Sequence, residues 1–352
     1  MRKKDILKDT NLTHGVTIVD VAAEAGVSYA TVSRVINNQD HVSPEKRERV
    51  LRAMTQLGYV ANIQARSLAG GSSHIVGLLV NYLSSSYAVE IIRGIDAALQ
   101  DNQYDLVLYS AHTHHTKESA YVAKLTRNLA DGLLLILPYH SQSYLDALRQ
   151  RRFPHVLVDY LSDGVDAPSV ATTNFRGAYE ATLYLLQLGH HRIGFITGAL
   201  ETGCAQQRLA GYKAALIDHG ILVDPQLISE GHFQQPQGYQ CAQYLLNLSD
   251  PPTAIFAAND MMAFGVMEAA RDKGLNLPED LSIVGFDDIP QASHVHPPLT
   301  TVRQPLEEMG KQAALLLLYY IAHPEAEIKR IELATELIVR DSCRVPHLAT
   351  GN

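Results

Sequence analysis

A change of hydrophobic pattern at residues 70–73 divides this chain of 352 residues into two parts. The sequence Gly-Gly-Ser-Ser at this point is typical of a linker, because neither residue type favours a regular element. Before it, apolar residues recur at helical spacing over short stretches; after it, short apolar runs alternate with longer amphipathic stretches. The length also exceeds that of one ordinary domain, so we expect a small helical domain followed by a larger one.

The larger part alternates strand and helix patterns, which predicts a doubly wound α/β body with parallel sheets. Its roughly 270 residues suit two lobes with a cleft between them. The expected strands are Ile75–Val80, Leu106–Tyr109, Gly132–Leu137, Val156–Val158, Arg192–Thr197, Ala254–Ala258 and Ser282–Phe286. The expected helices are Tyr87–Gln100, Lys117–Leu129, Ser143–Arg151, Phe175–Leu188, Ala205–Asp218, Gln237–Leu248, Met261–Lys273 and Leu306–Ala322.

The smaller part has the start signals of three helices. Thr17 and Ser28 are expected N-caps of helices at Ile18–Ala25 and Tyr29–Asn37, because their side-chain oxygens can accept from first-turn N–H groups. A third helix is expected to begin at Ser43-Pro44-Glu45, since proline is favoured in the first turn. Its expected core-facing stripe consists of Val50, Leu51, Met54 and Leu57.

The segment Ala22-x3-Gly26-Val27-Ser28 is the pattern of a helix-turn-helix. Alanine allows close helix packing, glycine permits the left-handed turn, and Val27 fills the core. This motif places its second helix in the major groove of DNA. The charge distribution agrees, since residues 1–70 carry 10 Lys and Arg against 7 Asp and Glu, whereas the remainder carries 19 against 30. A basic domain on an acidic body indicates binding of a polyanion.

Composition and motifs argue against several other classes. With 46% hydrophobic and 19% charged residues the chain is globular, and no apolar run is long enough to span a bilayer. The basic segment Met1–Asp9 precedes no apolar signal core, so we expect a cytoplasmic protein with no membrane partner. The distant Cys204, Cys241 and Cys343 form neither a disulfide framework nor a Cys-x-x-Cys metal site. No catalytic motif stands out, so we expect no enzyme activity, metal or cofactor.

The N-terminal region resembles the DNA-binding domain of the lactose/galactose repressor family. The matching strings are Val-Thr-Ile-Val-Asp-Val-Ala at 16–22, Ala-Gly-Val-Ser-Tyr-Ala-Thr-Val-Ser-Arg-Val-Ile-Asn at 25–37, Val-Ser-Pro-Glu-Lys-Arg at 42–47, Leu-Gly-Tyr at 57–59, and residues 62–69. The resemblance implies a sequence-specific transcriptional regulator, expected to be a repressor, that binds a pseudo-palindromic double-stranded operator as a homodimer.

The resemblance also implies roles for individual residues of the second helix. Tyr29, Ala30 and Arg34 lie where the family reads bases, and Arg34 can bond O6 and N7 of one guanine. The expected phosphate contacts are Thr17, Ser28, Ser33, Asn37 and His41, which set register rather than sequence. Two of these have simpler alternatives, Ser28 as a helix cap alone and His41 as an ordinary loop residue.

Residues 62–69 resemble the hinge helix of the family, which pairs across the dimer axis and enters the minor groove. The expected DNA-binding residues here are Asn62, Ala65, Leu68 and Ala69, with Leu68 as the wedge between central base pairs. The alternative is that Leu68 is a buried linker residue. A helix this short is marginal alone, so we expect it to form only when DNA and body hold it.

Residues 74–343 resemble the core of the same family, a two-lobed fold shared with periplasmic sugar-binding proteins. The strongest strings are at 188–198, 208–212, 257–265, 283–288 and 297–304. We therefore expect five segments: a flexible arm at 1–15, a DNA-binding domain at 16–60, a hinge and linker at 61–73, an effector-binding and dimerisation domain at 74–343, and a tail at 344–352. The tail has no sustained apolar heptad, which predicts a dimer rather than a tetramer.

Polar residues follow several expected strands, at the edge where open α/β sheets bind ligands. By position Asp159, Asn259 and Asp287 match the ligand contacts of the family, and so does Arg208. Phe233 lies where a sugar ring could stack, Gln304 is expected at the cleft rim, and Ser85 and Tyr87 are further expected contacts. Asp260 and Asp288 are instead expected to cap the helices that follow them.

The segment after the first strand departs from the family. Many members read Asn-Pro-Phe-Phe there, whereas this chain reads Asn-Tyr-Leu-Ser-Ser-Ser-Tyr at 81–87. Hydroxyl groups in place of paired phenyl rings favour a small carbohydrate effector over a purine. Tyr160 also replaces an Arg that is frequent in the family. The alternatives left open are a purine or nucleoside effector, a protein co-regulator, and a sugar-binding protein without a regulatory role.

Overall fold

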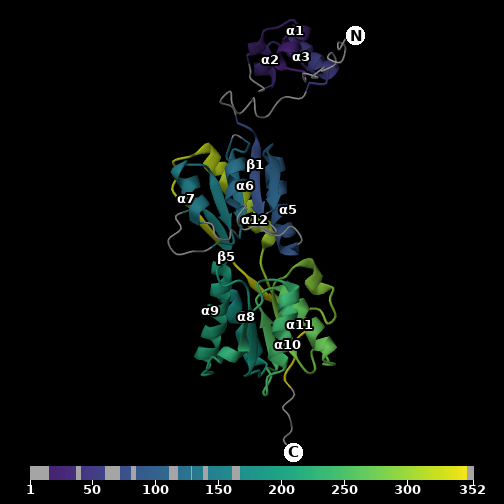
Figure 1. The fold of residues 1–352 in the computed structure, drawn as a ribbon, viewed down its shortest axis with the longest axis vertical. Helices are drawn as coiled ribbons and strands as arrows, with labels where there is room; N and C mark the ends of the chain where they lie inside the picture. The colour runs from purple at the N-terminus through teal and green to yellow at the C-terminus, as the bar shows by residue number, and fades with distance from the viewer. Residues whose placement is uncertain are drawn as a thin grey trace, which may run out of the picture. The chain divides into compact units, whose positions relative to one another are not determined.

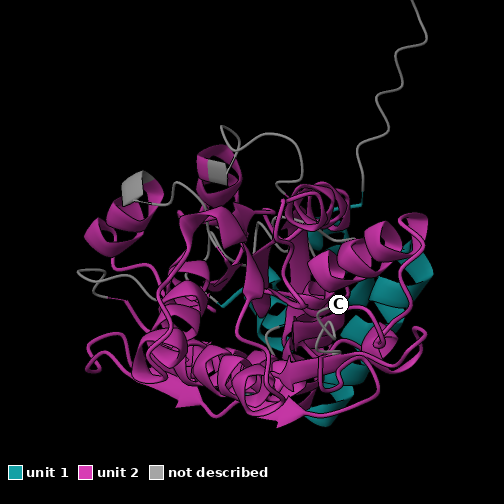
Figure 2. Ribbon diagram, turned by 90° about the horizontal axis from the view of Figure 1, so that it is seen from below, with its two compact units in different colours: residues 1–73 teal, residues 74–352 magenta. Residues whose placement is uncertain are grey.

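The computed structural model describes residues 16–36, 41–59, 72–80, 85–110, 118–127, 129–137, 142–160 and 167–346. The chain divides into two compact units, residues 1–73 and 74–352 (Figure 2). The predicted fold class is confirmed, because the first unit contains short helices and the second is a two-lobed α/β body with two largely parallel sheets.

The described part of the first unit forms the helices α1 (Ile18–Ala25), α2 (Tyr29–Ile36) and α3 (Pro44–Leu57). Val21, Val32 and Val50 are fully buried between them. The predicted apolar stripe of α3 was wrong at Leu51, which is 51% exposed. Ala53 takes its place in the core, because residues three apart lie on one helix face whereas Leu51 is rotated about 100° from Val50.

The first lobe of the body is a six-stranded parallel sheet in the order β11-β5-β4-β3-β1-β2 (Figure 1). Four of its strands are buried along their whole length, as expected for a sheet covered on both faces. The strands are β1 (Ile75–Val80), β2 (Asp105–Ser110), β3 (Gly132–Ile136), β4 (His155–Val158), β5 (Ser169–Thr172) and β11 (Arg330–Leu333). The helices are α5 (Ser86–Asp101), α6 (Glu118–Leu125), α7 (Gln142–Gln150) and α12 (Leu306–Ala322).

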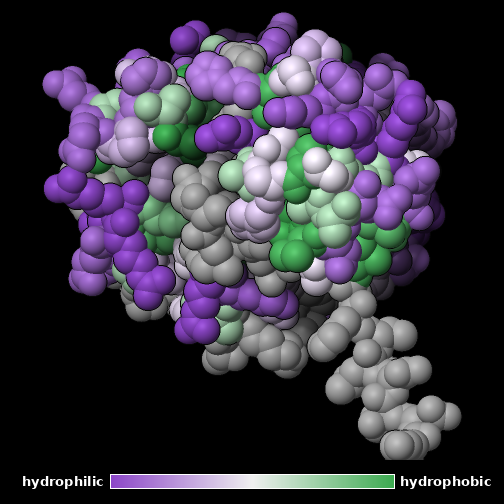
Figure 3. Space-filling model, turned by 90° about the horizontal axis from the view of Figure 1, so that it is seen from above, coloured by the Kyte–Doolittle hydropathy of each residue, from purple (hydrophilic) through white to green (hydrophobic). Residues whose placement is uncertain are grey.

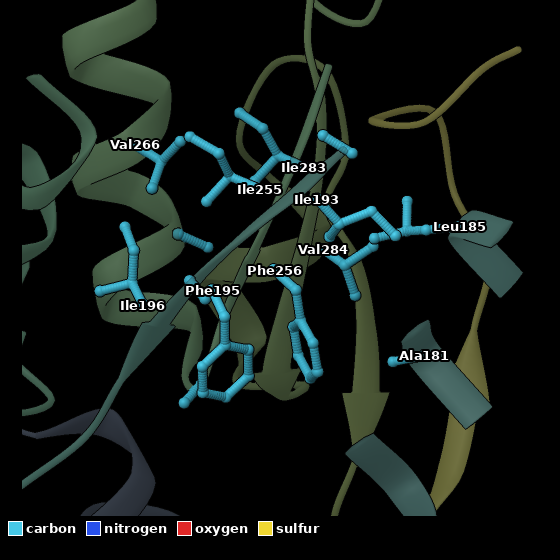
Figure 4. Packing of buried hydrophobic residues seen from close by; sticks show 14 of the residues in the cluster. Ala181, Leu185, Ile193, Phe195, Ile196, Ile255, Phe256, Val266, Ile283 and Val284 are labelled. Atoms are coloured by element: carbon cyan, nitrogen blue, oxygen red, sulfur yellow. The ribbon is translucent and has the colours of Figure 1, made fainter. Parts of the chain in front are cut away.

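The second lobe is a six-stranded sheet in the order β12-β10-β9-β8-β6-β7, in which β12 alone runs antiparallel. In its core the rings of Phe195 and Phe256 meet edge to face, with centroids 5.2 Å apart (Figure 4). The strands are β6 (Ile193–Thr197), β7 (Ile228–Glu230), β8 (Ala254–Ala257), β9 (Ser282–Asp287), β10 (Thr300–Arg303) and β12 (Glu336–Ile338). The helices are α8 (Asn174–Gln187), α9 (Gly203–Asp218), α10 (Gln235–Leu246), α11 (Asp260–Asp272) and the short η2 (Pro225–Leu227) and η3 (Pro290–Ser293).

The chain crosses between the lobes after β5, after β10 and between β11 and β12. The crossover after β5 and the one between β11 and β12 are hydrogen-bonded to each other: the Thr173 N–H donates to the Leu333 carbonyl at 3.0 Å, and the Thr335 N–H donates to Thr173 Oγ1 at 2.9 Å. As a result α12 and β11, late in the sequence, pack in the first lobe beside α5 and β5 (Figure 1).

The sequence patterns predicted the long elements well and missed five short strands: β5, β7, β10, β11 and β12. Each has only three or four residues, and β10 reads Thr-Thr-Val-Arg, so neither length nor alternation identifies it.

No helix in the described ranges is long and apolar enough to cross a bilayer. The face shown in Figure 3 is mainly hydrophilic, with smaller apolar areas between the polar side chains.

Glycines let the paired helices of both lobes approach closely. A Cβ on Gly94 of α5 would lie 1.8 Å from a carbonyl oxygen of α12, and a Cβ on Gly310 of α12 would lie 2.0 Å from one of α5. Gly211 of α9 and Gly265 of α11 meet the neighbouring helix in the same way, at 2.2 and 2.3 Å. Real Cβ atoms cannot approach so closely, so these backbones pack directly against each other.

We predict that Gly310→Ala destabilises the body. The higher helix propensity of alanine alone would stabilise the folded body by about 1 kcal/mol. Overpacking against α5 costs about 1–3 kcal/mol, so the net effect on the free energy of unfolding is a loss. Thermal unfolding should show a lower Tm for this variant, while Lys311→Ala on the exposed face of the same helix should change it little. An unchanged or raised Tm for Gly310→Ala would show that the two helices can separate at small cost.

Candidate functional site

A cleft of about 790 Å³, partly open to solvent, lies in the α/β body where strands of both sheets end. Its described lining comes from β1, α5, β3 and β4 of one lobe and from α9, α11, β9 and the segment after β7 of the other. Seven of the predicted effector residues line it: Ser85, Tyr87, Asp159, Arg208, Phe233, Asn259 and Asp287. Parallel strands bring these side chains together because their carboxyl ends share one edge.

The Arg208 guanidinium lies at the base of the cleft and is only 2% exposed. Its Nη1 is 3.5 Å from Asp287 Oδ1, and its Nη2 is 3.9 Å from Asp159 Oδ2. Nη1 also donates to the Ala258 carbonyl at 2.6 Å. Burial by itself lowers the pKa of Arg208, but the Asp287 and Asp159 carboxylates more than compensate and raise it. The group therefore stays charged, with partners from both lobes.

Two phenylalanines flank this guanidinium. Arg208 Cζ is 3.8 Å from the ring centroid of Phe286 and 5.8 Å from that of Phe233. The Phe233 ring fits only because residue 198 is glycine, since a Cβ there would lie 2.0 Å from it. Asn259 Nδ2 donates to the Phe233 carbonyl at 3.2 Å, and His232 and Phe233 both have left-handed φ values of 51° and 62°. Such strained backbone is concentrated at functional sites.

Asp159, the carboxylate of the first lobe, is held by two side chains. Its Oδ2 accepts from the Tyr87 hydroxyl at 2.8 Å and its Oδ1 from Asn174 Nδ2 at 3.3 Å. Burial and the nearby Asp159 raise the pKa of Tyr87 well above its usual range, so this hydroxyl remains a donor. Asn174 Oδ1 in turn accepts from Arg208 Nε at 2.7 Å, and thus links the carboxylate to the guanidinium.

Sequence reasoning missed Asn174, which is fully buried. Asn174 lies just after β5, where the chain crosses between the lobes, and a polar residue after a strand would have been a signal for it. The sequence did not predict β5, so this signal was not recognised. Other lining residues that were not predicted are mostly apolar: Val80, Ala88, Ile136, Leu137, Cys204, His232, Gln234 and Met261. Burial raises the pKa of Cys204 to about 12, so its thiol stays protonated.

Gln304 does not lie at the cleft rim, where it was predicted. It is 3% exposed and lies behind Asp287, to whose Oδ1 its Nε2 donates at 2.7 Å. Its Oε1 accepts from Thr172 Oγ1 at 2.5 Å. Because Gln304 directly follows β10 at a crossover, it connects Asp287 to a second crossover rather than facing the opening.

The expectation that Asp260 and Asp288 cap helices was wrong. Helix α11 is capped by Asn259, whose Oδ1 accepts from the Met262 N–H at 2.9 Å. Asp260 is instead fully buried and accepts from Thr301 Oγ1 at 2.5 Å and from the Ile289 N–H at 2.9 Å. Burial raises its pKa well above the usual value.

Asp288 lies in an ion-pair cluster. It accepts from Arg303 Nε and from Arg340 Nη2, both at 2.7 Å. Within the described residues no cluster of three or more His, Cys, Asp and Glu side chains could hold a metal ion.

In the first unit α2 presents Tyr29, Ala30 and Arg34 on its exposed face. Ser28 is a helix cap, since its Oγ accepts from the Thr31 N–H at 3.2 Å. The Thr17 N–H and hydroxyl both donate to Asp20 Oδ2, at 2.8 and 2.7 Å, which lowers the pKa of Asp20. His41 is exposed and Ser33 half-buried. The predicted DNA-binding residues Asn37, Asn62, Ala65, Leu68 and Ala69 lie outside the described residues.

Comparison with known protein families gives two matches. Residues 17–62 match the family described as bacterial regulatory proteins, lacI family, and residues 182–343 match the periplasmic binding protein-like domain. The chain is 35% identical to the HTH-type transcriptional repressor PurR of Haemophilus influenzae (strain PittEE) over 332 residues, which cover 93% of this chain and 98% of the relative.

Two solved structures are similar over nearly the whole chain. The transcriptional regulator CelR–cellobiose complex has a TM-score of 0.71 and 34% identity, covering 93% of this chain and 99% of that one. The lac repressor dimer bound to operator and the anti-inducer ONPF has a TM-score of 0.82 and 31% identity, covering 94% and 99%.

The buried carboxylates predict a pH-dependent stability. Burial raises the pKa of Asp287 from 3.8 to about 7, against the opposing effects of Arg208 and Gln304. The folded state therefore holds a proton between about pH 4 and pH 7 that the unfolded state has lost, and stability falls as pH rises through this window. Asp260, also raised, contributes with the same sign.

We predict that the Tm of effector-free protein falls from pH 5 to pH 8 more steeply than that of Asp287→Asn, which cannot ionise. The Tm difference between variant and wild type should shift by several degrees in favour of the variant at the higher pH. Thermal unfolding at several pH values measures both slopes. Parallel curves would mean that Asp287 is ionised in the folded protein throughout this range.

Proposed function

Within the lacI family of bacterial regulatory proteins, to which this chain belongs, we propose the role of a cytoplasmic repressor whose effector is a small carbohydrate. The observation that carries the proposal is the set of groups around Arg208: two carboxylates, one guanidinium and one phenyl ring. Carboxylates accept from sugar hydroxyls and a guanidinium donates to sugar oxygens. A phenyl face suits the C–H face of a sugar ring.

A purine or nucleoside is the second candidate effector, because the chain is similar to the PurR repressor. The described lining supports the carbohydrate, because it includes the hydroxyl-bearing residues Ser85 and Tyr87 together with the two carboxylates. A similar solved regulator is a complex with the disaccharide cellobiose, which agrees with this choice.

The proposed DNA-binding surface is the exposed face of α2. We expect Arg34 to form two parallel hydrogen bonds to guanine, and we expect Thr17, Ser28, Ser33 and His41 to contact phosphates. One such domain makes few contacts, so we expect a homodimer on a pseudo-palindromic operator, as in the similar lac repressor dimer. The predicted hinge residues Asn62, Ala65, Leu68 and Ala69 would add minor-groove contacts.

The proposed signal passes through the crossovers between the lobes. The side chains of Asn174 and Gln304 form hydrogen bonds with the charged cleft residues and also with Thr172. Asn174 Nδ2 donates to the Thr172 carbonyl at 3.2 Å, and the Thr172 hydroxyl donates to Gln304 Oε1. An effector that changes the lobe arrangement therefore changes these crossovers. Coupling between the two sites is typically about 1–3 kcal/mol and requires different effector affinity in the two states. We expect no chemical change of the effector, and recovery of unaltered sugar after long incubation tests this.

We predict that Arg34→Ala relaxes base preference at one operator position, by about 1–3 kcal/mol of discrimination. Binding-site selection followed by titration of single-base operator variants measures it. As a matched comparison, Ser28→Ala should weaken binding to all sequences about equally, and also lower Tm because a helix cap worth about 1 kcal/mol is lost. Unchanged base preference in Arg34→Ala would assign recognition to another face of the domain.

We predict that a thermal-shift screen of the full chain will find a neutral sugar among monosaccharides, disaccharides, sugar phosphates, nucleobases and nucleosides. A ligand at 100 times its Kd stabilises by about 2.7 kcal/mol, a readily measured shift. The shift should vanish in Asp287→Ala and persist in Asp250→Ala, whose site is an exposed ion pair with Arg192. A hit confined to nucleobases would replace the carbohydrate proposal by the purine alternative.

A further inference from the structure

Above about pH 7, where Asp287 is ionised, the described lining of the cleft carries more negative than positive charge. Asp159 and Asp287 face a single guanidinium, that of Arg208. The other basic residue of the described lining, His232, has a side chain that is 55% exposed and lies 3.5 Å from the Glu230 carboxylate. No lysine belongs to the described lining. An incoming ligand therefore meets an excess of carboxylate.

Within the described lining, the buried cation Arg208 is already engaged. Arg208 Nε donates to Asn174, Nη1 donates to the Ala258 carbonyl, and Phe286 lies against one face of the guanidinium. A phosphate or carboxylate on a ligand could bind Arg208 only by competing with Asp159 and Asp287. Either carboxylate would then be left buried without its cation, which is strongly unfavourable.

Acceptors, in contrast, remain available to a ligand. Asp287 Oδ1 is occupied by Gln304 and Arg208, but no described residue donates to its Oδ2. The Tyr87 hydroxyl donates to Asp159, and its oxygen keeps lone pairs that can accept a further hydrogen bond. Ser85, which precedes α5 in the same lobe as Tyr87, is a further hydroxyl-bearing residue of the lining. These groups match a ligand that offers several O–H donors and brings no negative charge.

We propose that the effector is an uncharged polyhydroxylated molecule, and that Asp159 and Asp287 exclude phosphorylated and carboxylated sugars. This inference rests on the proposed carbohydrate-responsive function and narrows its ligand class. Its physical basis is like-charge repulsion at two buried carboxylates, Asp159 at 2% and Asp287 at 3% exposed. A mismatched charge at such a site typically weakens binding by on the order of 100-fold or more.

Matched pairs of ligands test the proposal. Titration calorimetry on the full chain at about pH 8, where Asp287 is ionised, would compare ribose with ribose 5-phosphate, glucose with glucose 6-phosphate, and cellobiose with cellobiose 6-phosphate. The neutral member of each binding pair should bind at least about 100-fold more tightly than its phosphate ester. Gluconate, a carboxylated analogue of glucose, should bind as poorly as the phosphate.

Variants then test the cause. In Asp287→Asn and Asp159→Asn the ratio of neutral-sugar to sugar-phosphate affinity should fall by about tenfold, even if neutral-sugar binding also weakens. Asp250→Asn makes the same charge change in an exposed ion pair of the second lobe and should leave the ratio unchanged. Thermal unfolding of each variant checks that it is folded before the ratio is compared.

The outcomes separate this inference from the function on which it rests. Tighter binding of a sugar phosphate than of its neutral partner would overturn the charge exclusion and leave a carbohydrate effector intact. An unchanged ratio in both Asp159→Asn and Asp287→Asn would also overturn it, because the discrimination would then arise elsewhere. Binding of nucleobases with no binding of any sugar would overturn the carbohydrate function itself, and this inference with it.

Discussion

Burial of the Arg208 guanidinium is the constraint on which the rest of the cleft depends. A charge that is 2% exposed requires compensating partners. Arg208 has ion-pair partners in Asp159 after β4 and Asp287 at the end of β9, and it donates a hydrogen bond to the Ala258 carbonyl after β8. Because Asp159 belongs to the first lobe and Asp287 to the second, the lobes cannot change their arrangement without changing the contacts of one buried cation.

Two amide side chains extend this constraint to the lobe crossovers. Asn174 contacts Asp159 and Arg208, and Gln304 contacts Asp287. Both also bond Thr172, at the end of β5, so one polar network includes the cleft and two of the crossovers. Removing one partner from a buried network leaves the others unsatisfied, which costs more than the lost hydrogen bond. This gives a physical route by which a ligand in the cleft can alter the lobe arrangement.

Prediction from sequence succeeded where the signal is local. The helix α12 was predicted with both boundaries, because its apolar periodicity extends over 17 residues. Seven cleft residues were predicted. Asp159, Asn259 and Asp287 were found because each follows or ends a strand, and Arg208 because its string resembles the family. Ser85 and Tyr87 were proposed from the segment after the first strand, and Phe233 from its position in the family. The pattern failed for three-residue strands such as β7 and for Leu51, whose exposure depends on which face of α3 meets the other helices.

The sequence by itself determined the fold class, the DNA-binding helix-turn-helix and the family. These follow from hydrophobic periodicity, helix caps and short residue strings, all of which involve residues close together along the chain. Only the tertiary structure decided that Gln304 lies behind Asp287, that Asn174 joins Asp159 to Arg208, and that Asp260 is buried rather than capping α11. The physical reason is that these contacts join residues 15 to 41 positions apart or lie at crossovers, where the topology of two sheets selects the partner. No local sequence pattern indicates which partner is selected. The charge balance of the cleft depends on these long-range partners.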